Sequence, residues 1–391
     1  MDQPATINPP DTETTSGGGP GAPSWLRARW RWVAAAIVVI VAVASAAAIL
    51  RTGHTKQPKI VASTFESALL AGREGFAKAV TGGAGGPLVH VTSNADSGPG
   101  TLRAAAAGDS PAWIVFDHDM TIHLASRIDI GSNKTIDGRL HRVELTGHGQ
   151  YGLRTMGVHN VIIANLTLHD FGDATSTDDN DKPDAIDIRA ASTVWVYHCD
   201  LSMAGNKLID IGKGAYAITV SWTHFHDQEQ TFQIGDQATA TEDAAMTVTV
   251  DHNYFDHTSY RNPVVSYGKV HVYNNYIVGW KVYGVRSQRV GQIYLEANVF
   301  QALGNKKGTN VVTGRKNGCN DAGTRCDNRT GYIDAIGNLA ENGAVVLSNS
   351  PQLVFDPSKY YSYKAEAATP ALATKLVAET GPQRGTDLPH S

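Results

Sequence analysis

A strand pattern that recurs along the chain limits the possible folds more than any other feature of the sequence. Short runs with β-branched or aromatic residues at alternate positions are each followed by a small polar residue and another apolar pair, an alternation typical of β-strands. Aligning the runs places the polar residue at seven positions, 22 to 40 residues apart: Asn165, Cys199, Thr223, Asn253, Asn275, Asn298 and Asn338. Constant strands separated by loops of variable length indicate a solenoid.

The repeating unit favours a parallel β-helix over a leucine-rich or ankyrin array, because each unit holds two or three short strands and no helix. We expect the polar column at one inward corner of successive coils, where the amides bond backbone groups left unpaired by the bend and stack on one another. Glycine makes up 39 of 391 residues, above the usual ~7%. We expect these glycines to mark the corners.

The first sixty residues differ in composition from the rest. Residues 1–31 are rich in Pro, Gly, Thr and Ser and end with three arginines, which predicts a disordered cytoplasmic tail. Residues 32–50 are apolar except for Ser45 and long enough to cross a ~30 Å hydrocarbon core as a transmembrane helix. The arginines orient such an anchor with the remaining chain outside. A cleaved signal peptide is the alternative, because Ala44-Ser45-Ala46 resembles a cleavage site.

These features predict an organisation in five segments. Residues 51–60 form a linker, 61–350 an all-β solenoid that begins with a short helical pattern, and 351–391 a C-terminal extension. The solenoid is therefore expected to be extracellular or at the cell surface, either secreted or held by a single-pass anchor, and to be a monomer. In that oxidising environment Cys319 and Cys326, six residues apart in a polar stretch, can close a loop as a disulfide.

The charge balance argues against nucleic acid as a partner. The chain has 33 Lys and Arg residues against 37 Asp and Glu residues, a formal charge of -4. The basic residues form no long stripe, so there is no positive field to neutralise phosphates.

Motifs between about residues 75 and 345 resemble those of the extracellular pectate lyases of polysaccharide lyase family 1. They include Thr81-Gly-Gly-Ala-Gly-Gly, Asp184-Ala-Ile-Asp-Ile, Val194-Trp-Val-Tyr-His-Cys, Leu208-Ile-Asp-Ile-Gly-Lys-Gly, Arg261-Asn-Pro and Gly268-Lys-Val-His-Val-Tyr-Asn-Asn-Tyr. The resemblance implies a right-handed, single-stranded parallel β-helix. It also implies β-elimination on polygalacturonate or a related pectic polymer, in which calcium bridges the protein and the uronate carboxylate. An arginine removes the C5 proton, and Arg261 stands at the matching position.

The match is incomplete at the calcium site that the resemblance implies. Asp184 and Asp210 stand where the family has carboxylates, but Lys182 and Asn206 replace two others. Calcium prefers six to eight oxygen ligands and gains affinity with ligand charge. We therefore expect a weakened calcium site made by Asp184, Asp210 and the amide carbonyl of Asn206.

The substrate positions implied by the resemblance also differ. Gln230 replaces a lysine that contacts the uronate carboxylate, and Ser266 replaces a second arginine. Because fewer cations would pair with the polymer, neutral or esterified uronides become plausible substrates. Two alternatives to a calcium-assisted pectate lyase stay open. One is a β-helix that binds glycan without turnover, and the other is a calcium-independent pectin lyase in which Lys182 supplies the charge of the ion.

Overall fold

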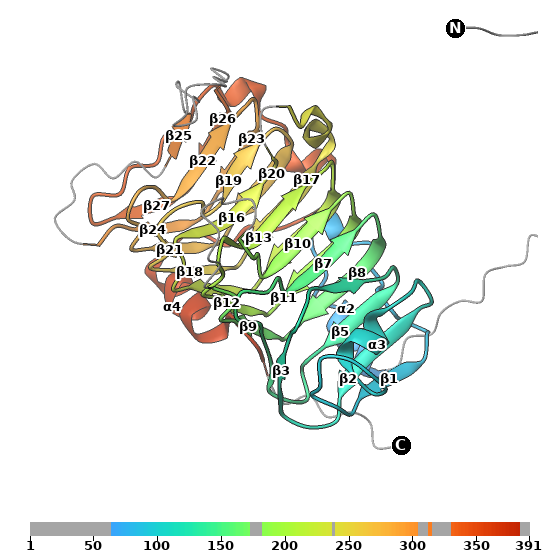
Figure 1. Ribbon diagram of the computed structural model, residues 1–391. Coiled ribbons are helices and arrows are strands. Elements are labelled where there is room, and N and C mark those ends of the chain that lie inside the picture. The colour runs from blue at the N-terminus through green and yellow to red at the C-terminus, as the bar shows by residue number, and fades with distance from the viewer. Residues whose placement is uncertain (1–63, 173–181, 237–238, 304–311, 315–329, 384–391) are drawn as a thin grey trace, which may run out of the picture. The chain divides into compact units, whose positions relative to one another are not determined.

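Figure 1 shows the computed structural model, which describes residues 64–172, 182–236, 239–303, 312–314 and 330–383. The predicted tail, membrane span and linker lie outside these residues, as do Cys319 and Cys326. The helices that the structure does describe are all too short or too polar to cross a bilayer.

Three parallel sheets make up the described part of the chain. Sheet A has ten strands: β1 (Leu88–Val91), β2 (Ala112–Phe116), β5 (Lys134–Asp137), β8 (His159–Ala164), β11 (Ser192–Tyr197), β14 (Tyr216–Ser221), β17 (Thr247–Asp251), β20 (Lys269–Tyr273), β23 (Gln292–Glu296) and β26 (Tyr332–Ile336). Sheet B has nine: β3 (Met120–His123), β6 (Val143–Thr146), β9 (Thr167–His169), β12 (Asp200–Ser202), β15 (His224–His226), β18 (Tyr254–Asp256), β21 (Tyr276–Val278), β24 (Val299–Gln301) and β27 (Leu339–Glu341).

Sheet C has eight strands: β4 (Ile128–Ile130), β7 (Leu153–Met156), β10 (Ile186–Arg189), β13 (Lys207–Gly212), β16 (Gln230–Ile234), β19 (Val264–Ser266), β22 (Val285–Gln288) and β25 (Val312–Gly314). From β10 onward, neighbours within each sheet are three strands apart in chain order, so each coil contributes one strand to each sheet. The parallel β-helix predicted from the repeat is confirmed.

The core is a set of apolar columns that run from coil to coil. One column on sheet A pairs β-branched residues in register: Val161, Val194, Ile218, Val248, Val270 and Ile293. All six side chains are fully buried. β-Branched residues suit a pleated surface and pack well against their cross-strand neighbours, which explains why the sequence repeats them at this position.

The predicted asparagine column is confirmed from Asn253 to Asn338. The side-chain oxygen of Asn275 accepts hydrogen bonds of 2.9 Å from both nitrogens of Asn253. Asn298 does the same for Asn275, and Asn338 for Asn298. Each amide nitrogen also donates to a backbone carbonyl, such as that of Val250 for Asn275. The ladder therefore satisfies the polar groups that the bend leaves unpaired.

Two details of the expected corner are wrong. Ala164 pairs with Tyr197, so Asn165 aligns with His198 and lies one residue before the ladder position of Cys199. The bend itself is made by the residue before each ladder position, which has a left-handed backbone with φ between 48° and 61°. Gly337 is the one glycine among these residues, which are Asn165, His198, Trp222, His252, Asn274, Ala297 and Gly337. Non-glycine residues can occupy this small region of backbone space, so the glycine excess does not locate the corner.

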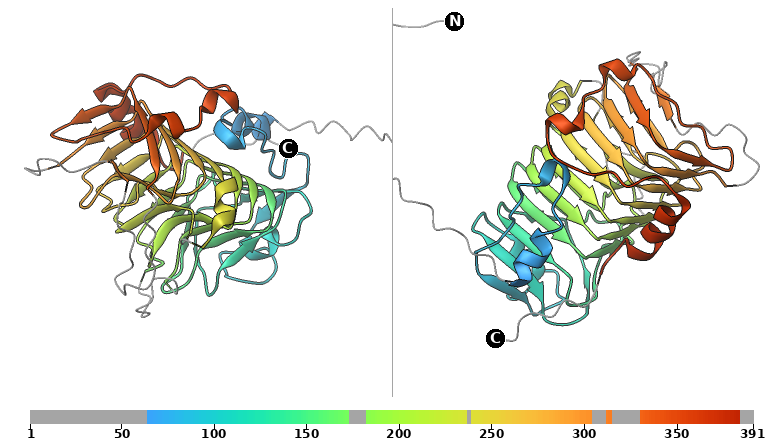
Figure 2. Two further views of the ribbon diagram at one scale, coloured as in Figure 1. Left: turned by 90° about the horizontal axis from the view of Figure 1, so that it is seen from above. Right: turned by 180° about the vertical axis from the view of Figure 1, so that it is seen from behind.

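Segments near the two ends of the chain cover the outer faces of sheets A and B, as the view from behind in Figure 2 shows. The helices α2 (Thr64–Leu70) and η1 (Gly75–Ala77) pack on sheet A, where Phe65 and Leu69 contact Trp113 and its neighbours. Helix α4 (Pro370–Glu379) buries Leu372 and Leu376 against sheet B. The other helices within the described residues are α3 (Leu102–Ala106), η2 (Thr241–Ala245), η3 (Pro351–Leu353) and η4 (Pro357–Lys359).

Candidate active site on the outer face of sheet C

Charged and polar residues form a row across the outer face of sheet C. Neighbouring strands place them in register, in the order Asp129, Arg154, Asp187, Asp210 and Gln233. Their strand neighbours Ile186, Ile188 and Ile209 are fully buried in the core. Because side chains alternate between the two faces of a strand, the row points outward, away from the core.

Three carboxylates gather in the middle of this row. Oxygens of Asp184, Asp187 and Asp210 all lie within 4.8 Å of one another. Asp184, just before β10, accepts a 2.9 Å hydrogen bond from the backbone nitrogen of Lys207. The structure therefore brings together the predicted pair Asp184 and Asp210. It adds Asp187, which the sequence analysis did not single out although Asp187 stands in the same motif.

Two cations already pair with these carboxylates. The Lys207 Nζ lies 2.9 Å from Asp210 Oδ2 and 3.6 Å from Asp184 Oδ1. Arg189 donates to Asp187 and Asp210, and its Nη1 lies 2.6 Å from Asp236 Oδ1. Sequence analysis missed both cations. Lys207 directly follows the substituted Asn206, and this proximity is the signal that could have pointed to it.

Burial and mutual charge set the protonation of this cluster. Burial acts to raise the pKa of Asp184, and the nearby carboxylates of Asp210 and Asp187 add to this shift against the opposing charge of Lys207. Burial alone would lower the pKa of Lys207, but Asp210 and Asp184 outweigh it and the pKa is raised. The pKa of Arg189 is raised for the same reason, because three carboxylates outweigh its burial. Both cations are therefore held in their charged forms.

The cluster as arranged does not fit a resident calcium ion. Three carboxylates face two cations, and oxygens of all three accept hydrogen bonds from Lys207 or Arg189. Asp210 Oδ1 is buried and has no hydrogen-bond partner among the described residues. Calcium prefers six to eight oxygen ligands, whereas here an ammonium and a guanidinium already bind these carboxylates and supply the positive charge.

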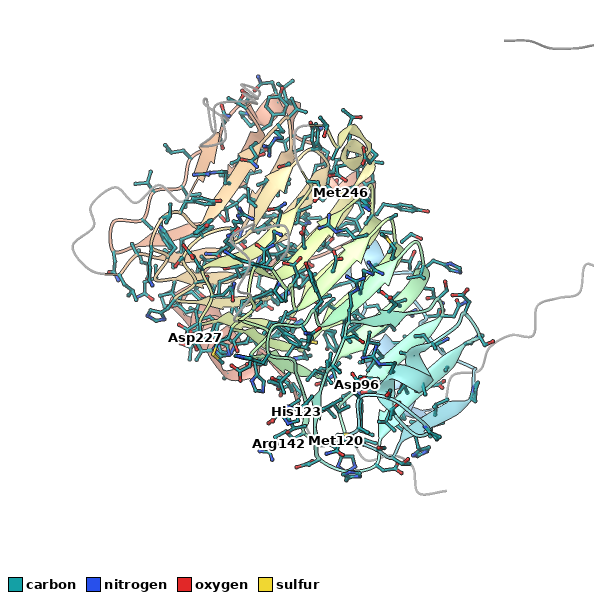
Figure 3. All side chains as sticks on the ribbon, viewed as in Figure 1. Asp96, Met120, His123, Arg142, Asp227 and Met246 are labelled. Atoms are coloured by element: carbon teal, nitrogen blue, oxygen red, sulfur yellow. The ribbon has the colours of Figure 1, made fainter. Side chains whose placement is uncertain are left out.

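The other predicted residues line a neighbouring cavity of about 460 Å³. Lys182, Asn206 and Gln230 share its wall with Tyr260. Figure 3 shows Asp227, also in the lining, at the edge of the solenoid near β12, with Met246 at the opposite edge beside β17. Three residues predicted from separate motifs, Lys182, Asn206 and Gln230, therefore line one cavity.

Arg261 precedes β19, one coil beyond Gln233 and two coils beyond Asp210. Its Nη1 donates to the side-chain oxygen of Gln233, and its guanidinium lies 5.5 Å from the ring centre of Tyr260. Its backbone oxygen accepts a 2.8 Å hydrogen bond from Phe232 of β16, which fixes its height along the solenoid. The charge of Arg261 acts to lower the pKa of Lys207, so the predicted base lies close to the cluster.

Arginines of the next coil extend the basic part of this face. The Ser266 Oγ accepts hydrogen bonds from Gln288, at 2.9 Å, and from Arg289 Nη1, at 3.1 Å. A guanidinium thus lies beside the position where the resemblance led us to expect one, although a different residue supplies it. Arg286 of β22 lies 3.7 Å from the ring centre of Tyr283. Neither arginine could be found by motif position, because both come from a later coil.

A larger cavity of about 590 Å³ lies elsewhere, lined by Glu74, Tyr197, His198 and Trp222. Its residues come from sheet A, from the corner after it and from the terminal segments. The row of charges and Arg261 lie on sheet C, so cavity size does not identify the candidate site, and we base the site on its chemistry.

Comparison with known proteins gives one consistent result. A family model described as pectate lyase matches residues 33–384. Pectate lyase 2 of Ambrosia artemisiifolia is 33% identical over 301 residues, covering 73% of this chain and 74% of that protein. A pectate lyase of Lilium longiflorum is 35% identical over 246 residues, covering 59% of this chain and 56% of that protein.

Solved structures agree with the fold. The crystal structure of jun a 1, the major allergen from cedar pollen, superposes with a TM-score of 0.70 at 27% identity, covering 85% of this chain and 97% of that one. A pectate lyase from Bacillus sp. N165, solved in complex with trigalacturonate, gives 0.59 at 23% identity, with 79% and 98% covered. At that identity the second likeness supports the fold alone.

Proposed function

This chain belongs to the pectate lyase family of polysaccharide lyases, and from that premise we propose that it cleaves pectate-like uronide polymers by β-elimination with Arg261 as the base. In this reaction the C5–H bond of a uronide unit breaks and its proton passes to Arg261 in its neutral, unprotonated form. A double bond forms between C4 and C5, and the glycosidic oxygen on C4 leaves with the bonding electrons and takes up a proton from water. Arg261 then returns its proton to the solvent. The products are a shortened chain and an unsaturated uronide end.

The partner of Arg261 is the observation that carries the proposal. Three carboxylates surround Arg189 and hold its pKa above the ordinary value, although burial opposes them, so that residue is a poor proton acceptor. Arg261 instead donates to a neutral amide, that of Gln233. A neutral partner stabilises the charged guanidinium less than a carboxylate does, which favours Arg261 over Arg189 as the base.

The outer face of sheet C and its neighbouring cavity, which we call the groove, favour a uronide of reduced charge. Gln230 lines the cavity where a lysine was expected, while Lys182, Arg286 and Arg289 supply cations elsewhere on this face. A few cations can pair with isolated carboxylates, and neutral Gln230 can bond an ester or hydroxyl group. Partly esterified pectin therefore suits the groove as well as polygalacturonate.

Calcium assistance, which the resemblance led us to expect, takes no part in this proposal. The carboxylates that were to hold the ion are paired with Lys207 and Arg189, and no step is assigned to a metal. We also propose that the solenoid works outside the cell as a monomer, exported or anchored by residues 32–50. The apolar run and the arginines before it support this location.

The test incubates the full-length protein with polygalacturonate and with methylated pectin, and follows ultraviolet absorbance of the unsaturated product. Arg261→Ala should lower kcat by about 10²- to 10⁴-fold, as loss of a positioned base does. Arg142→Ala is the matched control, because Arg142 is exposed beside sheet B and pairs with Glu144. Glycan binding without product on either polymer would leave the non-catalytic alternative, and full activity in Arg261→Ala would remove the base assignment.

A further inference from the structure

We propose that the ammonium of Lys207 occupies the carboxylate cluster in place of a divalent cation, so that this chain carries its own fixed charge where calcium was expected. The chemical consequence rests on the proposed function, because Lys207 would then help neutralise the carboxylate of the bound uronide. The occupancy of the cluster rests on the geometry alone and can be tested without substrate.

The contacts of Lys207 resemble those of a small cation. Its Nζ bridges two carboxylates, 2.9 Å from Asp210 and 3.6 Å from Asp184. The residue is 9% exposed and Asp210 is 1% exposed, so this is a buried bridge in a low-dielectric setting. A buried charge is tolerated only when it is paired, and Lys207 supplies that pairing.

The side chains of Lys207 and Arg189 already supply positive charge beside the carboxylates, which reduces the attraction of the cluster for a metal ion. Four carboxylates, those of Asp184, Asp187, Asp210 and Asp236, face the two cations Lys207 and Arg189. Removal of the Lys207 side-chain charge would leave Arg189 as the one cation among these four carboxylates, together with the buried Asp210 Oδ1 that has no hydrogen-bond partner among the described residues. Hard oxygen ligands with excess negative charge are what calcium selects, so loss of the ammonium should create a calcium site.

The position of Lys207 fits a role in the groove. It starts strand β13, where it pairs in register with Gln230, a residue of the cavity wall. It also lies close enough to Arg261 for the arginine's charge to act on it. The family resemblance pointed to Lys182 as the cation in place of calcium, but Lys182 lines the cavity, and Lys207 has the contacts to both carboxylates.

Calcium binding to the full-length protein provides the direct test. Isothermal titration calorimetry with CaCl₂, after treatment with chelator, should show no saturable binding to the wild type. Lys207→Ala should bind calcium at least tenfold more tightly than the wild type, and its unfolding temperature should rise when calcium is added. Lys207→Gln keeps a hydrogen-bond donor toward Asp210 and serves as a second variant if the alanine protein does not fold. Lys359→Ala, at an exposed position in η4, is the control and should behave as the wild type.

Each outcome decides the proposal. Saturable calcium binding to the wild type would overturn it, because the cluster would then accept an ion beside Lys207. Equal absence of binding in the wild type and in both folded Lys207 variants would also overturn it, because the cluster would not be a cation site. If the wild type is active, its rate should be unchanged by chelator, and a loss of activity that calcium restores would count against the proposal. If no uronide is cleaved, the proposed function fails while the calorimetry still decides the occupancy of the cluster.

Discussion

At the scale of single residues, the difference between the two arginines of the groove explains how one face can hold both a fixed charge and a base. Arg189 is bound by Asp187, Asp210 and Asp236, and its role is to organise the carboxylates. Arg261 is bound by Gln233 and is supported on one side by Tyr260. Gln233 is therefore a positioning residue, since it acts on the reaction through the guanidinium.

This difference predicts the behaviour of two variants of Gln233. Gln233→Ala should lower kcat by about tenfold, because the guanidinium loses its orientation. Gln233→Glu should lower it further and move the pH–rate profile to higher pH, because a carboxylate stabilises the charged form of Arg261. The measurement is kcat against pH on the better of the two uronide polymers. Identical pH profiles for the wild type and Gln233→Glu would contradict the assigned role of Gln233.

Part of the site could be read from the sequence because motif position fixes backbone position in a repeating fold. Asp184, Asp210 and Arg261 were found in this way, and all three lie on or beside the row of sheet C. Lys207 was missed because a lysine side chain has many possible conformations. Its contact with Asp184 could be recognised only once the structure had placed β10 beside β13. Arg289 was missed because its partner Ser266 is one coil earlier.

At the scale of elements, the asparagine ladder holds one corner of the solenoid together. Asn275 donates to the carbonyls of Val250 and Tyr273 and accepts from both nitrogens of Asn253. The sequence revealed the column because the same side chain recurs after each strand of sheet A. The misplacement of Asn165 has a physical cause, since asparagine also favours the left-handed backbone of the bend and so fits the adjacent position equally well.

Loss of one rung should therefore be costly. Asn275→Ala leaves a buried backbone N–H and carbonyl without partners, and each such group costs roughly 1–3 kcal/mol. We expect the variant to lose about 3 kcal/mol of unfolding free energy, measured by chemical denaturation. Asn94→Ala, at an exposed position, should change stability by less than about 0.5 kcal/mol. Equal denaturation midpoints for Asn275→Ala and Asn94→Ala would show that the ladder does not stabilise the fold.

At the scale of the whole described molecule, the N-terminal segment docks on sheet A through buried carboxyl groups. Glu74, between α2 and η1, accepts a 3.1 Å hydrogen bond from the Tyr273 hydroxyl and contacts Asp251 and His252. Burial, followed by the charge of Asp251, raises the pKa of Glu74 to about 9. Burial also raises the pKa of Asp251 to about 7 and lowers the pKa of His252. Glu366 and Lys375 act on His252 from the C-terminal side.

The docking should consequently weaken as the solution becomes alkaline. The folded protein holds protons on Glu74 and Asp251 that the unfolded chain releases near pH 4.5 and near pH 3.8, respectively. The free energy of unfolding therefore falls as pH rises through the folded pKa values. The stabilisation is complete below the unfolded pKa and is lost by about pH 9. A pKa that is higher by one in the folded than in the unfolded protein corresponds to about 1.4 kcal/mol of unfolding free energy.

Glu74→Gln tests this linkage, because an amide can donate to Asp251 without a titrating proton. The unfolding temperature of the wild type should decline between neutral pH and about pH 9, whereas that of Glu74→Gln should decline less. Glu242→Gln, at an exposed position in η2, is the matched control and should follow the wild type. If all three proteins lose stability in parallel, the protonation of Glu74 does not hold the N-terminal segment in place. If only Glu74→Gln resists alkali, protonated carboxyl groups hold the segment that covers sheet A, whereas the cations Lys207 and Arg189 on sheet C stay charged across the same pH range.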